Sequence, residues 1–174
     1  MPAWYARALR THPLATRAVT AAAIAAAGDV ACQLNDSGAV DAARTLRFSS
    51  WALLNTPFVS RWYVHLGARF PASPARRVLA DQLLWAPPAT AACLFYLGAL
   101  EAGTAAGGAA RAAERLAPTL AANWTVWPAV QAVNFGFVPP AYQILFSNVV
   151  GLGWSFMLSR LAATPPPPPP RAPA

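Results

Sequence analysis

The sequence predicts an all-α integral membrane protein: a bundle of four transmembrane helices with one short re-entrant or interfacial helix. Two observations predict this class. Hydrophobic residues make up 56% of the 174 residues and charged residues only 11%, whereas soluble domains are about one quarter charged. Residues 82–100 and 116–159 are uncharged, and a helix needs about 20 apolar residues to cross a bilayer. We expect one membrane domain, 1–163, and a disordered Pro-rich tail, 164–174.

The first two predicted spans lie near 14–34 and 48–66. The first is rich in alanine and includes Arg17 and Asp29, but its small residues suit close packing between helices. The second is uncharged only over 48–60, so it spans only if Arg61 extends to the headgroups. Aromatic residues near its ends are expected to anchor it at the interface: Trp51, Trp62 and Tyr63.

The third span is predicted near 80–100 and the fourth near 142–160. Between them, the Gly/Ala-rich residues 101–115 predict a loop and a short surface helix. A further helix is predicted over 126–138, because Thr125 can cap it, Pro128 falls in its first turn and prolines end it. At about 20 Å this helix is too short to cross a hydrocarbon core of about 30 Å.

The arginines predict how the spans are oriented. With four spans, nine arginines lie on the side that holds both termini and four on the other. If residues 116–138 also spanned, the split would be seven to six. Since cytoplasmic or matrix loops carry the excess of basic residues, the four-span arrangement is favoured, with both termini on that side.

Polar residues within the predicted helices are the candidates for function. Trp127, Gln131 and Asn134 form one stripe of the helix over 126–138. Its two carboxamides either bond to neighbouring helices or line a watery cavity. Asp29 with Gln33, and Asp81 with Gln82, form a second constellation. Three roles stay open for these carboxylates: an ion pair, a role in permeation, or simple solvation at the end of a span. If they form ion pairs, the expected cationic partners are Arg17, Arg47 or Arg61.

The sequence argues against several other functions. The two histidines and two cysteines have no metal-ligand or catalytic spacing, and there is no Gly-rich phosphate loop. We therefore expect no enzyme, no metal and no cofactor. Nucleic-acid binding is not expected either, because the arginines lie at the edges of apolar stretches rather than on one basic face.

Several strings resemble the Mpv-seventeen / twenty-two-kilodalton peroxisomal membrane protein family. The likeness runs from about residue 4 to residue 161, in the family's order and spacing. One departure is Gln143, where the family usually has Arg in the stretch after Val-Pro; its effect stays open. The strings are GDVACQ from Gly28, LLNTPFVSRWYVHL from Leu53, LADQLLWAP from Leu79, NWTVWPAVQAVNFGFVP from Asn123 and SNVVGLGWSFMLS from Ser147.

The resemblance implies a four-span protein of an organellar membrane that forms a channel or pore for small metabolites. The alternative is a non-transporting scaffold that organises the membrane, and a homo-oligomer stays open as a partner arrangement. The basic N-terminus, with no acid before Asp29, is typical of mitochondrial targeting segments. The mitochondrial inner membrane is therefore slightly preferred over the peroxisomal membrane.

Overall fold

The computed structural model describes residues 2–163, and side chains up to Gly153. The described residues form helices joined by short turns and contain no strand, so the all-α class is confirmed. The predicted tail, 164–174, lies outside the described residues. The helices are α1 (Ala3–Thr11), α2 (Pro13–Ser37), α3 (Ala42–Arg69), α4 (Pro74–Ala80), the π-helical turn η1 (Asp81–Trp85), α5 (Ala86–Ala102), α6 (Ala105–Phe137) and α7 (Gln143–Ala163).

Local signals explain where these helices begin and end. Gly38 ends α2 with φ 70° and Gly103 ends α5 with φ 68°, a left-handed conformation that a glycine adopts without a Cβ clash. Asp41 caps α3 because its carboxylate accepts from the amide of Arg44 at 3.1 Å. The hydroxyl of Thr104 caps α6 in the same way.

All four predicted spans coincide with helices. Residues 14–34 lie in α2 and 48–66 in α3, while 80–100 lie largely within η1 and α5 and 142–160 largely within α7. Within the described part of the chain, Pro13–Ser37 and the continuous run Pro74–Ala102 are long and apolar enough to cross a membrane. Each of the four predicted spans therefore coincides with a helix, and composition marks two of these helices as candidate spans.

The predicted short helix over 126–138 is wrong. It belongs to α6, which has 33 residues and contains Pro118 and Pro128 in its interior. Thr125 does not cap a helix; its hydroxyl donates to the carbonyl of Ala122 at 2.7 Å. The predicted loop over 101–115 is wrong as well, because only Gly103 and Thr104 separate α5 from α6. Each proline removes one helical hydrogen bond, and packing of α6 against its neighbours keeps the helix continuous.

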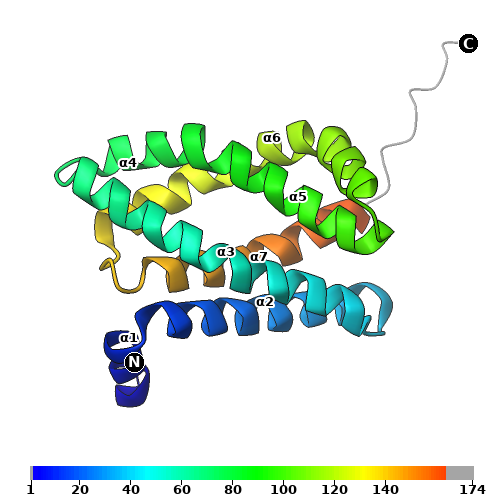
Figure 1. Ribbon diagram of the computed structural model, residues 1–174, viewed down its shortest axis with the longest axis horizontal. Helices are drawn as coiled ribbons and strands as arrows, with labels where there is room; N and C mark the ends of the chain where they lie inside the picture. The colour runs from blue at the N-terminus through cyan, green and yellow to red at the C-terminus, as the bar shows by residue number, and fades with distance from the viewer. Residues whose placement is uncertain (1, 164–174) are drawn as a thin grey trace, which may run out of the picture.

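The helices pack as two groups (Figure 1). α2 packs against both α3 and α7, while α5 and α6 form a tight hairpin next to α4. Glycines bring the hairpin together: a Cβ at Gly98 would lie 2.8 Å from Cβ of Arg111, and one at Gly108 would lie 2.6 Å from the carbonyl oxygen of Phe95. α1 stands away from the bundle at the start of α2.

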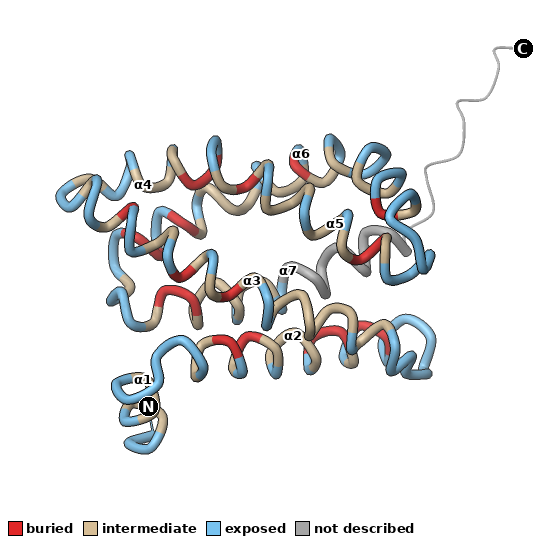
Figure 2. The backbone as a smooth tube through the Cα atoms, viewed as in Figure 1, coloured by how far each residue is buried: buried red, intermediate tan, exposed pale blue. Residues whose placement is uncertain are grey.

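The outer faces of the bundle are apolar. Figure 2 shows buried segments on the inward sides of the helices and exposed ones on α1 and the outward sides. Many large apolar side chains are exposed, including Val19, Leu46, Phe58, Val64 and Phe137. Exposed apolar surface on this scale is typical of a face that contacts a membrane or a partner.

Candidate functional site

Polar side chains from four helices meet around Asp81, whose exposed fraction is 2%. Its Oδ1 accepts a hydrogen bond from Trp62 Nε1 at 2.9 Å. Its Oδ2 accepts from Gln131 Nε2 at 2.9 Å and from Gln82 Nε2 at 3.1 Å. The carboxylate therefore binds three neutral donors, which come from α3, α6 and η1.

The hydrogen bonds continue from Gln131 toward α7. Gln131 Nε2 also donates to the Tyr63 hydroxyl at 2.8 Å, and its Oε1 accepts from Asn134 Nδ2 at 2.9 Å. Asn134 Nδ2 donates in addition to Ser147 Oγ, which lies 3.2 Å from the Tyr63 hydroxyl. We call this set the Asp81 network: Trp62, Tyr63, Asp81, Gln82, Gln131, Asn134 and Ser147.

The π-helical turn η1 explains how two adjacent residues can both face inward. Asp81 and Gln82 are both buried, although neighbours on a regular helix point about 100° apart. In η1 the carbonyl of Asp81 accepts from the amide of Ala86, five residues later. Pro87 and Pro88 follow directly and donate no backbone hydrogen bond to the preceding turn. Such π turns are frequent at functional sites.

The Asp81 network has more acceptors than donors. Gln82 Oε1 and Asn134 Oδ1 are buried without a hydrogen-bond partner, and Asn134 is 0% exposed. Within the described side chains, none of the ion pairs includes Asp81. Buried polar groups are nearly always satisfied by protein or by water. The unpaired acceptors therefore mark a place that suits a hydrogen-bond donor such as water or a hydroxyl-bearing solute.

A groove of about 480 Å³ reaches the edge of the Asp81 network. It lies between the α4–η1 segment and α6, and Gln82 is one of the residues that line it. Trp124 also lines this groove, and its indole donates to the carbonyl of Gln82 at 3.3 Å. The network thus meets an apolar groove at Gln82.

Asp29 and Gln33 belong to a second, separate cluster at the α2–α3 turn. Asp29 forms an ion pair with Arg44 Nε at 3.0 Å, and its Oδ2 accepts from Gln33 Nε2 and from the hydroxyl of Thr45. The predicted partners, Arg17, Arg47 and Arg61, are therefore wrong. α3 begins at Ala42, so its first turn, rather than its middle, lies beside the end of α2.

The two clusters lie near opposite ends of α3. Thr45 and Trp62 are 17 positions apart on this helix, which corresponds to about 26 Å at 1.5 Å per residue. The six polar candidates therefore do not form one continuous hydrogen-bonded stripe among the described residues. Trp127 joins neither cluster: it is half-buried, and its ring lies near Gly151 of α7.

Gln143 bridges the turn between α6 and α7. It is 4% exposed, and its Nε2 donates to the carbonyls of Val138 at 3.2 Å and Asn134 at 3.4 Å. The last carbonyls of a helix have no partner within that helix. Gln143 therefore supplies a donor to carbonyl groups at the end of α6, including that of Asn134, which belongs to the Asp81 network.

Sequence reasoning missed part of each cluster. Trp62 and Tyr63 were expected to be interfacial anchors, but their polar atoms bind to the Asp81 network. Ser147 was not singled out, although a hydroxyl in an uncharged stretch was a visible signal. Arg44, the ion-pair partner of Asp29, was not among the three cations expected. Among the described residues, no group of three or more His, Cys, Asp or Glu could hold a metal.

Comparison with known proteins identifies relatives over most of the chain. The model of the Mpv17 / PMP22 family matches residues 98–159. The chain is 36% identical to protein sym-1 of Neurospora crassa over 92% of this chain and 98% of the relative. It is 30% identical to peroxisomal membrane protein 2 of Bos taurus, with 90% and 87% covered, and 38% identical to mitochondrial inner membrane protein Mpv17 of Drosophila melanogaster, with 70% and 76% covered. No solved structure matches significantly.

Proposed function

Because the chain belongs to the Mpv17 / PMP22 family of membrane proteins, we propose that it is a channel or pore for small metabolites in an organellar membrane. The names of its relatives place them in the peroxisomal membrane and in the mitochondrial inner membrane. The proposed function involves no catalytic step, and the surrounding partner is the lipid bilayer. The observation that carries the proposal is the Asp81 network, in which a carboxylate that is only 2% exposed lies inside the bundle without an ion-pair partner among the described side chains.

We propose that four helical segments cross the bilayer: α2, α3, the α4–α5 run and α7. α3 has 28 residues, or about 42 Å at 1.5 Å per residue, which exceeds a hydrocarbon core of about 30 Å. α6 lies beside the α4–α5 run, from Gly108 next to Phe95 to Gln131, which binds Asp81, so it is the candidate for a fifth crossing. That crossing would divide the arginines seven to six between the two sides. The excess of basic residues on one side favours four crossings.

Tags at the two ends test this number directly. We expect tags at the N-terminus and at the C-terminus to be digested from the same side of sealed organelles or vesicles. An even number of crossings requires this, whereas a fifth crossing by α6 would place the tags on opposite sides. Protease protection of each tag, before and after the membrane is permeabilised, gives the answer, and tags on opposite sides would exclude four spans.

The chemistry of the Asp81 network supports transport more than anchoring alone. Ionisable residues within a membrane mark ion and substrate pathways by default, because they are costly to bury. Here the carboxylate has only neutral partners, and Gln82 Oε1 and Asn134 Oδ1 lack donors. A water-filled or solute-filled path would supply those donors, whereas a purely structural network would gain from pairing them within the protein.

A double substitution, Gln131→Leu with Asn134→Leu, tests the pore. We expect the fold to persist, since interhelical hydrogen bonds in membranes contribute about 0.6 kcal/mol each. Flux of small solutes through liposomes should fall on the order of tenfold, the effect of about 1.4 kcal/mol on a barrier. Solute release from vesicles that carry equal amounts of folded protein measures this.

The matched control is Ala129→Leu with Val133→Leu, two exposed positions of the same helix. This variant should retain wild-type flux, because its side chains point away from the Asp81 network. Equal flux through wild type and the Gln131/Asn134 variant would remove the network from the path. If neither protein conducted solutes, the scaffold would be favoured. The observation that supports a scaffold is that most polar groups of the network pair with one another across helices.

A further inference from the structure

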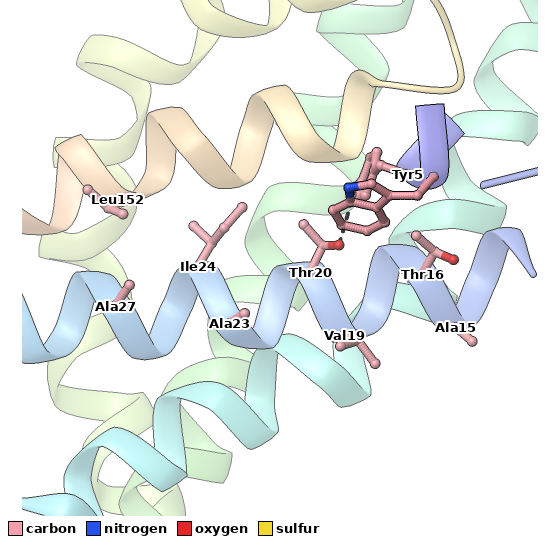
Figure 3. A pocket seen from close by; sticks show the side chains of 10 residues that line it. Tyr5, Ala15, Thr16, Val19, Thr20, Ala23, Ile24, Ala27 and Leu152 are labelled. Carbon is pink, nitrogen blue, oxygen red and sulfur yellow. Dashed lines mark hydrogen bonds between the residues drawn. The ribbon is translucent and has the colours of Figure 1, made fainter. Parts of the chain in front are cut away.

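α1 and α2 enclose a groove on the outside of the bundle (Figure 3). The hydroxyl of Tyr5 on α1 donates to Oγ1 of Thr20 on α2 at 3.2 Å, which links the two helices about two turns from their junction. The groove has a volume of about 680 Å³, and Leu152 of α7 is part of its lining. Trp4, which is 69% exposed, lies at its α1 side. We call it the α1–α2 groove.

The lining of the α1–α2 groove is apolar. Besides Trp4, it consists mainly of the side chains of Val19, Ala23, Ile24 and Ala27. Both of its threonine hydroxyls already take part in a hydrogen bond: Thr16 donates to the carbonyl of His12 at 2.8 Å, and Thr20 accepts from Tyr5. The groove therefore suits a hydrocarbon chain and offers little to a polar ligand.

The length and position of the groove match one leaflet of a bilayer. Along α2 its lining extends from Ala15 to Ala27, about 18 Å at 1.5 Å per residue. One leaflet contributes about half of a hydrocarbon core of about 30 Å. Since the candidate span begins at Pro13, the groove starts near the headgroup level and continues toward the middle of the membrane.

The helices that border the groove carry basic residues near their junction. Arg7 and Arg10 are exposed on α1, and the chain has no acidic residue before Asp29. The Nε atom of Arg17 is buried without a hydrogen-bond partner. In the described part of the chain, none of these three arginines takes part in an ion pair. Guanidinium groups at this level complement the phosphate of an anionic lipid.

We propose that the α1–α2 groove binds one acyl chain of an anionic phospholipid, whose phosphate contacts Arg7 and Arg10. α1 is then an interfacial amphipathic helix that the lipid attaches to α2. The apolar lining, the one-leaflet length and the unpaired arginines together select this occupant. The proposal is independent of whether the protein conducts solutes.

Quenching of Trp4 by brominated lipids tests the proposal. The full chain and its Trp4→Phe variant are reconstituted in phosphatidylcholine vesicles that contain a small share of brominated phosphatidylglycerol or brominated phosphatidylcholine. The difference between the two proteins isolates the signal of Trp4 from that of the other tryptophans. We expect phosphatidylglycerol to be enriched at Trp4 by roughly twenty-five-fold, the product of about fivefold for each of two arginines at the headgroup surface.

Three variants identify the cause of the enrichment. Arg7→Gln with Arg10→Gln should abolish the preference for phosphatidylglycerol, whereas Arg69→Gln with Arg76→Gln, at two other exposed arginines, should retain it. Ala23→Phe should fill the groove and lower quenching by both lipids. Added inorganic phosphate should not displace the lipid. Equal quenching by the two lipids, or a preference that survives loss of Arg7 and Arg10, would overturn the proposal.

Discussion

Replacement of Asp81 by leucine is expected to lower the free energy of unfolding by about 3 kcal/mol or more. The change removes the acceptor shared by Trp62, Gln82 and Gln131. An unsatisfied buried donor costs about 1–3 kcal/mol, and three donors would be left inside the bundle. Reversible denaturation in mixed micelles, followed by circular dichroism, measures the difference. Flux through liposomes should fall as well if the network lines the path.

Two control variants separate the effect of losing the hydrogen-bond acceptor from the effect of losing the negative charge. Asp81→Asn keeps one carbonyl acceptor and should cost less than the leucine variant, about 1 kcal/mol, the contribution of one hydrogen bond. Glu114→Gln changes an exposed carboxylate and should leave stability unchanged within about 0.5 kcal/mol. If Asp81→Leu were as stable as wild type, the three donors would have found other partners and the network would not stabilise the fold.

Replacement of Gly108 by alanine is expected to cost about 3 kcal/mol. A Cβ at this position would lie 2.6 Å from the carbonyl oxygen of Phe95 and 3.0 Å from Cβ of Ala99. Rotation of a side chain cannot relieve a clash with backbone, so α5 and α6 would have to separate. The free energy of unfolding, measured in the same micelles, gives the size of the effect.

Gly136 provides a matched control on the same helix. A Cβ at Gly136 would meet nothing within 4 Å, and alanine is favoured over glycine in a helix interior by about 1 kcal/mol. Gly136→Ala should therefore leave stability unchanged or raise it. A loss for Gly136→Ala as large as that for Gly108→Ala would assign the effect to helix α6 itself rather than to its contact with α5.

Charge spacing was sufficient to locate the helical stretches that were predicted as spans. The uncharged stretches bounded by Asp81, Glu101, Arg115 and Arg160 mark long apolar segments, and long apolar segments form helices because their backbone groups bond internally. The prediction from proline and glycine was wrong for residues 101–138. Proline and glycine are local signals for turns, but α6 continues through Pro118 and Pro128 because its contacts with neighbouring helices outweigh two missing hydrogen bonds.

The pairing of polar residues could not be predicted in the same way. Asp81, Gln82, Gln131 and Asn134 were visible as polar groups within apolar helices, and all four meet in one network. Their partners depend on how helices from different parts of the chain are placed, which the sequence pattern does not encode locally. The choice of Arg44 for Asp29 likewise depends on where α3 begins relative to the end of α2.

The sequence by itself determined the helical class, the approximate positions of the predicted spans and which polar residues lie within them. Only the tertiary structure decided that these residues form two clusters rather than one stripe, and that Trp62, Tyr63 and Ser147 complete the larger one. The reason is physical. Hydrophobicity and backbone bonding act within one segment, whereas a buried carboxylate is satisfied only by donors that other helices bring within about 3 Å.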